Sequence, residues 1–485
     1  MRVRRAVFLV VALAAAAAGS AGGGAMRVGT ARAASVPAGV AARPYVRHVV
    51  LIVQENRTFD NLFGGPGPGV PPGSPSPYPS AYPGADATWP PGVAASMVST
   101  PIDDKGAGDG GHDAWACVNQ STPNARFSTA QWTAVSNNTI PPAVCQNGDH
   151  SFFRYVPQDQ RTIYWQIARE YGLGDEFFAA TNSASYPPHQ FIVAGDASFT
   201  MPGNAPYDER EWWLADQPAA DCSTTGSASG PVVGPSVFSM RVTTPDNRVG
   251  CYDRPTYADR LNAANVSWTH YTTAIPPTDI GVFDGFINSV AWSGPTHVLH
   301  GGHFLPATQV LDDAKAGKLP EFVWVKPPCI RQSDHPGQGG HNGPNWVGSV
   351  INAIGDSSEW SSTVIFVIWD DWGGFYDHVV PPTPPPWQLG RGVRIPFLVI
   401  SPYLARRGEV VHTAGHPGSI MRFVDDLYGT APLTAFDRDA PDLAGWFDFS
   451  ASRSRTPFQT IPGAAAQPYD HTMCEGSRAI VPVDS

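Results

Sequence analysis

Two stretches of sequence decide the fold: residues 48–60 read HVVLIVQENRTFD, and residues 364–371 read VIFVIWDD. Each begins as a short, almost continuously apolar run rich in β-branched residues, and each passes directly into polar side chains. Apolar runs without polar alternation are typical of parallel strands that are covered on both faces of a sheet. Residues 322–325 (FVWV) and 397–401 (FLVIS) have the same pattern. The sequence therefore predicts four buried parallel strands.

Helical patterns lie between these strands. Apolar residues at helical spacing predict three helices, over residues 161–171, 345–355 and 419–428. Gly172 and Gly429 follow the first and the last as expected C-terminal caps. Strands that alternate with helices favour an α/β sandwich around a mostly parallel sheet. No linker separates two cores, so we predict one domain over residues 42–450 and a C-terminal tail over residues 451–485.

The composition of the 485-residue chain sets limits on its function. Hydrophobic residues make up 42% of the chain, which is enough for a sizeable core, and the 49 Gly and 49 Pro predict long loops. We expect such loops at residues 64–92 and 216–247, and a rigid polyproline-like turn at residues 381–386. The net charge is −11, and no basic run is present. Nucleic acid is therefore not an expected partner, because phosphate contacts need clustered Lys and Arg.

Residues 1–34 have the pattern of a signal peptide. Arg4 and Arg5 precede an apolar stretch over residues 6–18, which is too short to span a bilayer, and residues 31–33 form a small-residue cleavage signal. The paired arginines leave both the general and the twin-arginine export routes open. Loss of this segment, whose five charged residues are all Arg, would leave a net charge of −16. We expect a secreted or periplasmic protein without stable membrane insertion.

Six cysteines follow the predicted signal peptide. An even number in an exported chain favours disulfides. Six cysteines allow fifteen pairings. Nearest neighbours along the chain give the simplest one: Cys117 with Cys145, Cys222 with Cys251, and Cys329 with Cys474. None lies in a CxxC pair, so a zinc–thiolate site is not expected.

Polar residues follow both of the deciding strands where they end. Glu55 and Asn56 come after the first, and Asp370 and Asp371 come after the second. Ligands of open parallel sheets bind outside the carboxyl ends of the strands. Three carboxylates brought together there would repel one another unless a cation held them. The sequence thus predicts a metal site, although an isolated Asp-Asp pair is also common as a helix cap or a solvated turn.

A candidate nucleophile lies in residues 183–191, which read SASYPPHQF. A serine on a tight proline-containing turn can present its hydroxyl to a cation, which makes the alkoxide accessible near neutral pH. Thr181, Ser183 and Ser185 are the candidates. We favour Ser185, because it is nearest to the turn that Pro187 and Pro188 stiffen. The alternative is that a serine in such a turn has a structural role.

Several of the 14 histidines lie in polar, Gly-rich settings. Such loops can bring imidazoles to a ligand as donors to phosphate oxygens or as general acids. His297, His300 and His303 also have a spacing that could bind a metal, but surface positions are the simpler interpretation. The candidates in Gly-rich settings are His112, His297, His300, His303, His335 and His341.

Taken in order from about residue 47 to 448, these segments resemble the bacterial phosphoesterase family that contains a respiratory-burst-inhibiting acid phosphatase and the secreted phospholipases C. The matching pieces are HVVLIVQENRTFDNLFG, YGLGDEFF, SYPPHQFIVAG, YADRLNAANVSWTHY, KLPEFVWVKP, SDHPG, WSSTVIFVIWDDWGGFYDHV and VRIPFLVISPY. The resemblance implies an alkaline-phosphatase-like α/β/α fold. One departure is Pro188, where the family often has Asn.

The same resemblance implies roles for individual residues. It maps the metal ligands onto Glu55, Asn56, Asp370 and Asp371. It maps the nucleophile onto Ser185. It also implies that His112 and His335 contact the phosphoryl group of the substrate.

We therefore expect a secreted, metal-dependent hydrolase of phosphoric esters. The metal would be Ca²⁺, Mg²⁺ or Mn²⁺ for oxygen ligands alone, or Zn²⁺ if a histidine joins them. The substrate would be a phosphate ester, and both soluble esters and phospholipids stay open. Phospholipase C members tend to carry extra C-terminal modules, which weakens the lipid interpretation. The alternative, a non-catalytic exported binding protein on the same fold, is supported only by Pro188.

Overall fold

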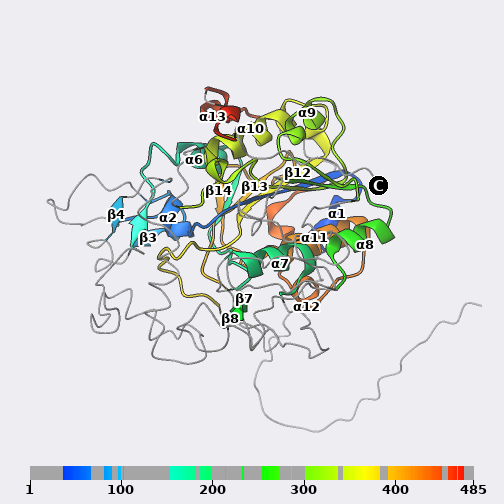
Figure 1. The fold of residues 1–485 in the computed structure, drawn as a ribbon, viewed down its shortest axis with the longest axis horizontal. Helices are drawn as coiled ribbons and strands as arrows, with labels where there is room; N and C mark the ends of the chain where they lie inside the picture. The colour runs from blue at the N-terminus through cyan, green and yellow to red at the C-terminus, as the bar shows by residue number, and fades with distance from the viewer. Residues whose placement is uncertain are drawn as a thin grey trace, which may run out of the picture. The chain divides into compact units, whose positions relative to one another are not determined.

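The stretch at residues 48–54 forms β1 (His48–Gln54), a strand inside the central sheet of this computed structural model (Figure 1). Every residue of β1 after His48 is buried. The structure describes residues 36–66, 81–89, 97–99, 102, 153–181, 185–197, 213–214, 232–233, 254–272, 286, 301–336, 342–382, 392–450, 457–466 and 468–474.

The central sheet has eight strands in the order β10-β9-β11-β1-β12-β13-β6-β14. The three strands that carry the site are adjacent, with β1 between β11 and β12. In the order of the sheet, the strands are β10 (Phe304–Pro306), β9 (Trp268–Thr272), β11 (Phe322–Val325), β1, β12 (Thr363–Trp369), β13 (Phe397–Ile400), β6 (Gly172–Gly174) and β14 (Glu409–Val411).

The direction of β13 corrects one prediction. β13 runs antiparallel to both of its neighbours, β12 and β6, whereas the other neighbouring strands of the sheet are parallel. The mostly parallel α/β sheet is thus confirmed, but the prediction that residues 397–401 form a parallel strand is wrong. All four residues of β13 are buried. A continuous apolar run reports burial on both faces, and it carries no information about direction.

Two groups of helices cover the sheet. α10 packs against α6, α9 and α13, whereas α11 packs against α1, α7 and α12, and the groups lie on opposite sides of the strands in Figure 1. The helices are α1 (Ala38–Ala42), α2 (Phe59–Phe63), α6 (Thr162–Glu170), α7 (Tyr186–Ala194), α8 (Tyr257–Ala263), α9 (Gln309–Lys315), α10 (Gly343–Gly355), α11 (Pro417–Tyr428), α12 (Ala435–Arg438) and α13 (Pro462–Ala466). Within the described residues, no helix has the length and apolar character needed to cross a membrane.

The three predicted helices are present as α6, α10 and α11. Gly429 caps α11 with a φ of 76°, as expected. Gly172 does not cap α6: the cap is Tyr171, and Gly172 begins β6. A glycine is needed at that position for a different reason, because a Cβ atom would lie 2.9 Å from the ring of Trp446.

Short strand pairs and one disulfide complete the described part. Residues 64–92, expected as an irregular loop, contain β2 (Gly65–Pro66) and β3 (Thr88–Trp89), which pair in parallel. Two further pairs join β4 (Val98–Ser99) to β5 (Arg154–Tyr155) and β7 (Trp213–Leu214) to β8 (Val232–Val233). Cys329 and Cys474 form the disulfide that nearest-neighbour pairing predicts. The other four cysteines, and all but two residues of the predicted loop at 216–247, lie outside the described residues.

Candidate active site

Three neighbouring strands deliver charged side chains to one edge of the sheet. Glu55 follows β1, Asp370 and Asp371 follow β12, and Lys326 follows β11. These strands are parallel, so their carboxyl ends meet at the same edge. All four charged side chains are buried. The predicted carboxylates are therefore brought together, and a lysine that the sequence analysis did not single out joins them.

Backbone hydrogen bonds tie the ends of β1 and β12 together. The N–H of Asp370 donates to the carbonyl of Gln54 (2.9 Å), and the N–H of Asn56 donates to Asp370 Oδ1 (2.9 Å). Asn56 has a φ of 59°, in the left-handed region that few residues other than Gly and Asn adopt. Gly373, with a φ of 63°, packs so closely that a Cβ there would lie 2.3 Å from the Asn56 carbonyl oxygen. The position of Asn56 is thus fixed from both sides.

Ser185 points into this edge from the start of α7. Its hydroxyl donates to Asp371 Oδ2 (2.9 Å) and lies 3.2 Å from Asn56 Oδ1, and the residue is buried. Ser185 occupies the N-cap position of α7 but makes no capping hydrogen bond with its side chain. Thr181 is buried nearby in the chain, and Ser183 lies outside the described residues.

The structure adds His189 to the predicted residues. His189 follows Ser185 by one turn of α7, and its Nε2 lies 3.3 Å from Glu55 Oε1 and 3.2 Å from Asp370 Oδ2. This role was not predicted from the sequence, because Pro187 and Pro188 suggest a tight turn. Proline is tolerated in the first turn of a helix, so the segment is helical and the i, i+4 spacing puts both side chains on one face.

Lys326 fills the space beside Glu55. Its Nζ lies 2.7 Å from Glu55 Oε1 and 3.3 Å from His189 Nε2. A sequence signal for it did exist, because Lys326 directly follows an apolar strand in the same way as Glu55 and Asp370.

The ionisable side chains of this buried site lie close together, so burial and their mutual interactions shift their pKa values. Burial, reinforced by the Asp370 charge, raises the pKa of Glu55 to about 7. Burial also acts to raise the pKa of Asp370, but the neighbouring His189 outweighs it and holds that pKa below its usual range. Burial and Lys326 act to lower the pKa of His189, yet Glu55 and Asp370 raise it overall. The carboxylates therefore resist being ionised together without a further cation.

The side chains at this edge fit a metal ion. One ligand atom each of Glu55, His189 and Asp370 lies within 4.8 Å of the others. Asp370 Oδ2 accepts no well-directed hydrogen bond from the described residues, although His189 Nε2 is near it. A buried carboxylate oxygen in that state suits a cation. Carboxylates, the Asn56 amide and one imidazole are ligands for Mg²⁺, Mn²⁺ or Zn²⁺.

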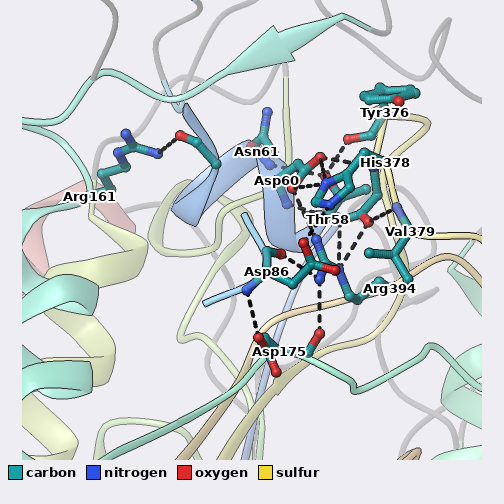
Figure 2. A network of polar contacts seen from close by, with 12 residues as sticks. Thr58, Asp60, Asn61, Asp86, Arg161, Asp175, Tyr376, His378, Val379 and Arg394 are labelled. Carbon is teal, nitrogen blue, oxygen red and sulfur yellow. Dashed lines mark hydrogen bonds and ion pairs between the residues drawn. The ribbon is translucent and has the colours of Figure 1, made fainter. Parts of the chain in front are cut away.

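A second acidic cluster is formed by Asp60, Asp377 and His378 (Figure 2). It differs from the cluster around Glu55 because the positive charges of Arg394 and His378 lie within it. Arg394 donates from Nη2 to Asp60 Oδ1 and from Nε to Asp377 Oδ1, both at 3.0 Å. His378 Nδ1 lies 2.8 Å from Asp60 Oδ2, and its Nε2 lies 2.9 Å from Asp86 Oδ1. Burial opposes ionisation of His378, but Asp60 raises its pKa to about 10. This cluster is a buried ion network that is balanced without a metal.

Of the predicted histidines, the structure describes His303 and His335. His335 is buried after β11, and its Nδ1 lies 2.8 Å from the Pro336 carbonyl. His303 stacks on Trp268 at a ring separation of 4.1 Å, which is a packing role. His112, His297, His300 and His341 lie outside the described residues.

The segment that carries His335 is anchored through Asp334. The Asp334 carbonyl accepts hydrogen bonds from Arg57 Nε (2.9 Å) and Nη2 (2.6 Å), and its N–H donates to Gln54 Oε1 (3.1 Å). Its Oδ2 accepts from Tyr164 Oη (2.7 Å) and Trp369 Nε1 (2.8 Å). The chain before His335 is therefore held against Gln54 and Trp369, the residues that precede Glu55 and Asp370 in the sequence.

Comparison with known proteins points to one family. The model of the family described as "Phosphoesterase family" matches residues 46–431. Phospholipase C B of Mycobacterium tuberculosis is 24% identical over 84% of this chain and 78% of that protein. Non-hemolytic phospholipase C of Pseudomonas aeruginosa is 24% identical over 86% of this chain, which spans 59% of that protein.

A solved structure also resembles the chain. It is a protein in the alkaline phosphatase superfamily from Vibrio parahaemolyticus, 14% identical, covering 57% of this chain and 63% of that one. A TM-score of 0.29 indicates only a distant likeness, and no conclusion rests on it.

Proposed function

The chain belongs to the phosphoesterase family, and from this premise we propose that Ser185 is the nucleophile of a metal-dependent hydrolase of phosphoric esters. The predicted family is confirmed by the match and by the phospholipase C relatives, which support a hydrolase acting on phosphoric ester bonds. The observation that supports the nucleophile best is the pair of contacts that Ser185 Oγ makes with Asp371 and Asn56.

The proposed reaction starts at Ser185. Its Oγ attacks phosphorus, and its proton moves to Asp371 Oδ2, the acceptor 2.9 Å away. The bond from phosphorus to the ester oxygen breaks, and that oxygen takes a proton from a histidine, for which His335 and His112 are the candidates. Water then attacks phosphorus and gives a proton to the histidine, and the bond from phosphorus to Ser185 Oγ breaks. Oγ takes back the proton from Asp371, which restores the hydroxyl and releases inorganic phosphate from a monoester or a phosphomonoester from a diester.

The proposed metal ligands are Glu55, Asn56, Asp370 and Asp371, with His189 in reach of the same space. A bound divalent ion would supply positive charge to the phosphoryl oxygens and lower the pKa of the serine hydroxyl. Its identity among Ca²⁺, Mg²⁺, Mn²⁺ and Zn²⁺ stays open: carboxylate and amide oxygens suit the first three, and the imidazole of His189 favours Zn²⁺.

The proposed substrates are phosphate esters, with phospholipids among them because two relatives are named phospholipases C. A paired assay tests this proposal: hydrolysis of p-nitrophenyl phosphate and of p-nitrophenyl phosphorylcholine, each with and without a chelator. We expect chelator-sensitive release of p-nitrophenol from at least one, and the faster substrate separates monoester from diester chemistry. Activity on neither substrate with Mg²⁺, Mn²⁺, Ca²⁺ or Zn²⁺ added would contradict the proposal.

We also propose that residues 1–34 direct export. The Cys329–Cys474 disulfide supports this, because such bonds persist in oxidising compartments. Fractionation of an expressing bacterium and sequencing of the mature N-terminus test it. An uncleaved protein in the cytosol would contradict it.

A further inference from the structure

Lys326 has a position that the proposed reaction does not yet use. It is 4% exposed and follows β11 directly, and Glu55 is its only carboxylate partner among the described residues. Taking an ammonium out of water costs several kcal/mol, and buried ion pairs often contribute nothing net to stability. A buried lysine at a cluster of proposed metal ligands therefore calls for an explanation other than stability.

We propose that Lys326 is a fixed second cation of this site, which neutralises Glu55 and limits the site to one divalent ion. This inference rests on the proposed function, because it presumes that a metal binds at Glu55 and Asp370. Lys326 acts through Glu55, so it is a positioning and charge-balancing residue.

The charges of the site support a single ion. Glu55, Asp370 and Asp371 carry three negative charges when ionised, and Lys326 carries one positive charge. One divalent ion brings the total to zero, whereas two would leave an excess of two positive charges in a buried site. Nζ of Lys326 lies 2.7 Å from Glu55 Oε1 and 3.3 Å from His189 Nε2, so an ion that binds Asp370 shares Glu55 and His189 with an ammonium already in place.

The start of α7 offers a phosphoryl group few backbone N–H groups, which gives fixed positive charge at this site a role. Helix N-termini bind phosphate through their free N–H groups and their dipole. Among the first four residues of α7, Pro187 and Pro188 have no N–H, and the N–H of the fourth, His189, donates back to the Ser185 carbonyl. The helix therefore offers a phosphoryl group few hydrogen-bond donors, and fixed positive charge nearby has more to contribute.

The proposal makes an unusual prediction about affinity. Removing a metal ligand weakens binding, but removing Lys326 takes away both a repelling charge and a competitor for Glu55. Lys326→Met should therefore bind a divalent ion more tightly, by about tenfold or more. At the same time its turnover should fall, by about tenfold or more, because charge balance and the position of Glu55 are lost.

The experiment titrates Mn²⁺ into metal-stripped protein by calorimetry, with metal counted per chain by elemental analysis. Lys318→Met is the matched control, because Lys318 is exposed and lies close to β11 in sequence. Lys326→Gln, whose amide can still donate a hydrogen bond to Glu55, replaces Lys326→Met if that variant does not fold, as judged by circular dichroism. We expect one ion per wild-type chain, tighter binding in the Lys326 variant and no change in the control.

Three outcomes separate this inference from the proposed function. Unchanged or weaker Mn²⁺ binding in the Lys326 variant, with one ion in the wild type, overturns the inference and leaves the proposed function intact. Two ions per wild-type chain also overturn it. No binding to the wild type by any of Mn²⁺, Mg²⁺, Ca²⁺ or Zn²⁺ removes the metal from the proposed function itself.

Discussion

At the scale of single residues, the hydroxyl of Ser185 is the group on which the proposed reaction depends most. Ser185→Ala removes the nucleophile but leaves Glu55, Asp370 and His189 in place. We expect the rate to fall by about a thousandfold or more, with Mn²⁺ affinity nearly unchanged. Steady-state kinetics and calorimetry on the same preparation measure both.

Thr181→Ala is the matched control for that variant. Thr181 is buried in the same part of the chain, and we expect its loss to cost about tenfold at most. If phosphate were trapped on Thr181 or Ser183, and never on Ser185, the nucleophile would be that residue and the assignment of Ser185 would be wrong.

Asp370 combines two roles that a substitution can separate. Its Oδ1 accepts the N–H of Asn56, and its Oδ2 faces His189. Asp370→Asn keeps an oxygen for the first contact but loses the charge, so folding should change little. Metal affinity should fall by about tenfold or more, and turnover by about a hundredfold or more. Near-native activity after dialysis against a chelator would exclude Asp370 as a ligand.

Sequence alone identified the members of the site that follow a simple rule. Glu55, Asn56, Asp370 and Asp371 come directly after apolar strands, and the structure brings them together. Lys326 obeys the same rule, but it was not predicted, because a charged lysine is not a metal ligand. His189 could not be placed without knowing that α7 begins at Tyr186, since only a helix puts it on the same face as Ser185.

At the scale of elements, α11 contains a carboxyl group that opposes folding at neutral pH. Burial, together with the nearby charge of Asp437, raises the pKa of Asp425 to about 8. Its Oδ1 accepts a hydrogen bond from Thr430. Because the folded pKa lies above the ordinary value of 3.8, the folded state holds a proton that the unfolded chain releases. The contribution of Asp425 to stability is therefore full below about pH 4 and declines as the pH rises to about 8.

Asp425→Asn should remove that decline. The amide keeps an oxygen for Thr430 and carries no charge at any pH. We expect the variant to match the wild type near pH 4 and to exceed its free energy of unfolding at pH 8 by several kcal/mol, up to about 6 kcal/mol. Urea denaturation across this pH range measures the difference, with the exposed Asp356→Asn as control. A difference that does not grow with pH would contradict the assignment.

The errors made from the sequence at this scale share one physical cause. The apolar run of β13 looks the same in a parallel or an antiparallel strand, because both faces are buried in either case. Pro187 and Pro188 favour a turn and the first turn of a helix alike. The local pattern of apolar residues predicted that these segments are buried and form regular elements. The direction of β13 and the first residue of α7 depend on contacts with residues distant in the sequence.

At the scale of the whole molecule, the Cys329–Cys474 disulfide joins positions 145 residues apart. Between these two positions lie β12, β13 and α11, and α13 packs on α10 and α6 shortly before Cys474. Cross-links over long stretches restrict the unfolded chain most, so Cys329→Ala with Cys474→Ala should cost about 2–4 kcal/mol. Denaturation with and without reductant measures this loss, which should disappear when the wild type is reduced.

Free-thiol titration of the denatured, unreduced protein extends that test to the remaining cysteines. If all six are paired as expected of an exported chain, close to no thiol should react. Several reactive thiols would contradict both the predicted pairing of the other four cysteines and the argument for export.

The reversed direction of β13 has a consequence for how this protein could diversify. Connections between parallel strands must cross from one edge of the sheet to the other, whereas a connection between antiparallel neighbours leaves and returns at the same edge. The chain from Trp369 to Phe397 is such a connection, and it starts and ends at the edge that holds Glu55 and Ser185. This connection does not have to pass along the strands to the opposite edge, so the length of the strands does not set a minimum for its own length. Lineages could lengthen or shorten the part of this stretch between His378 and Arg394 and acquire new substrates, while Asp370, Asp371 and the strands kept their places.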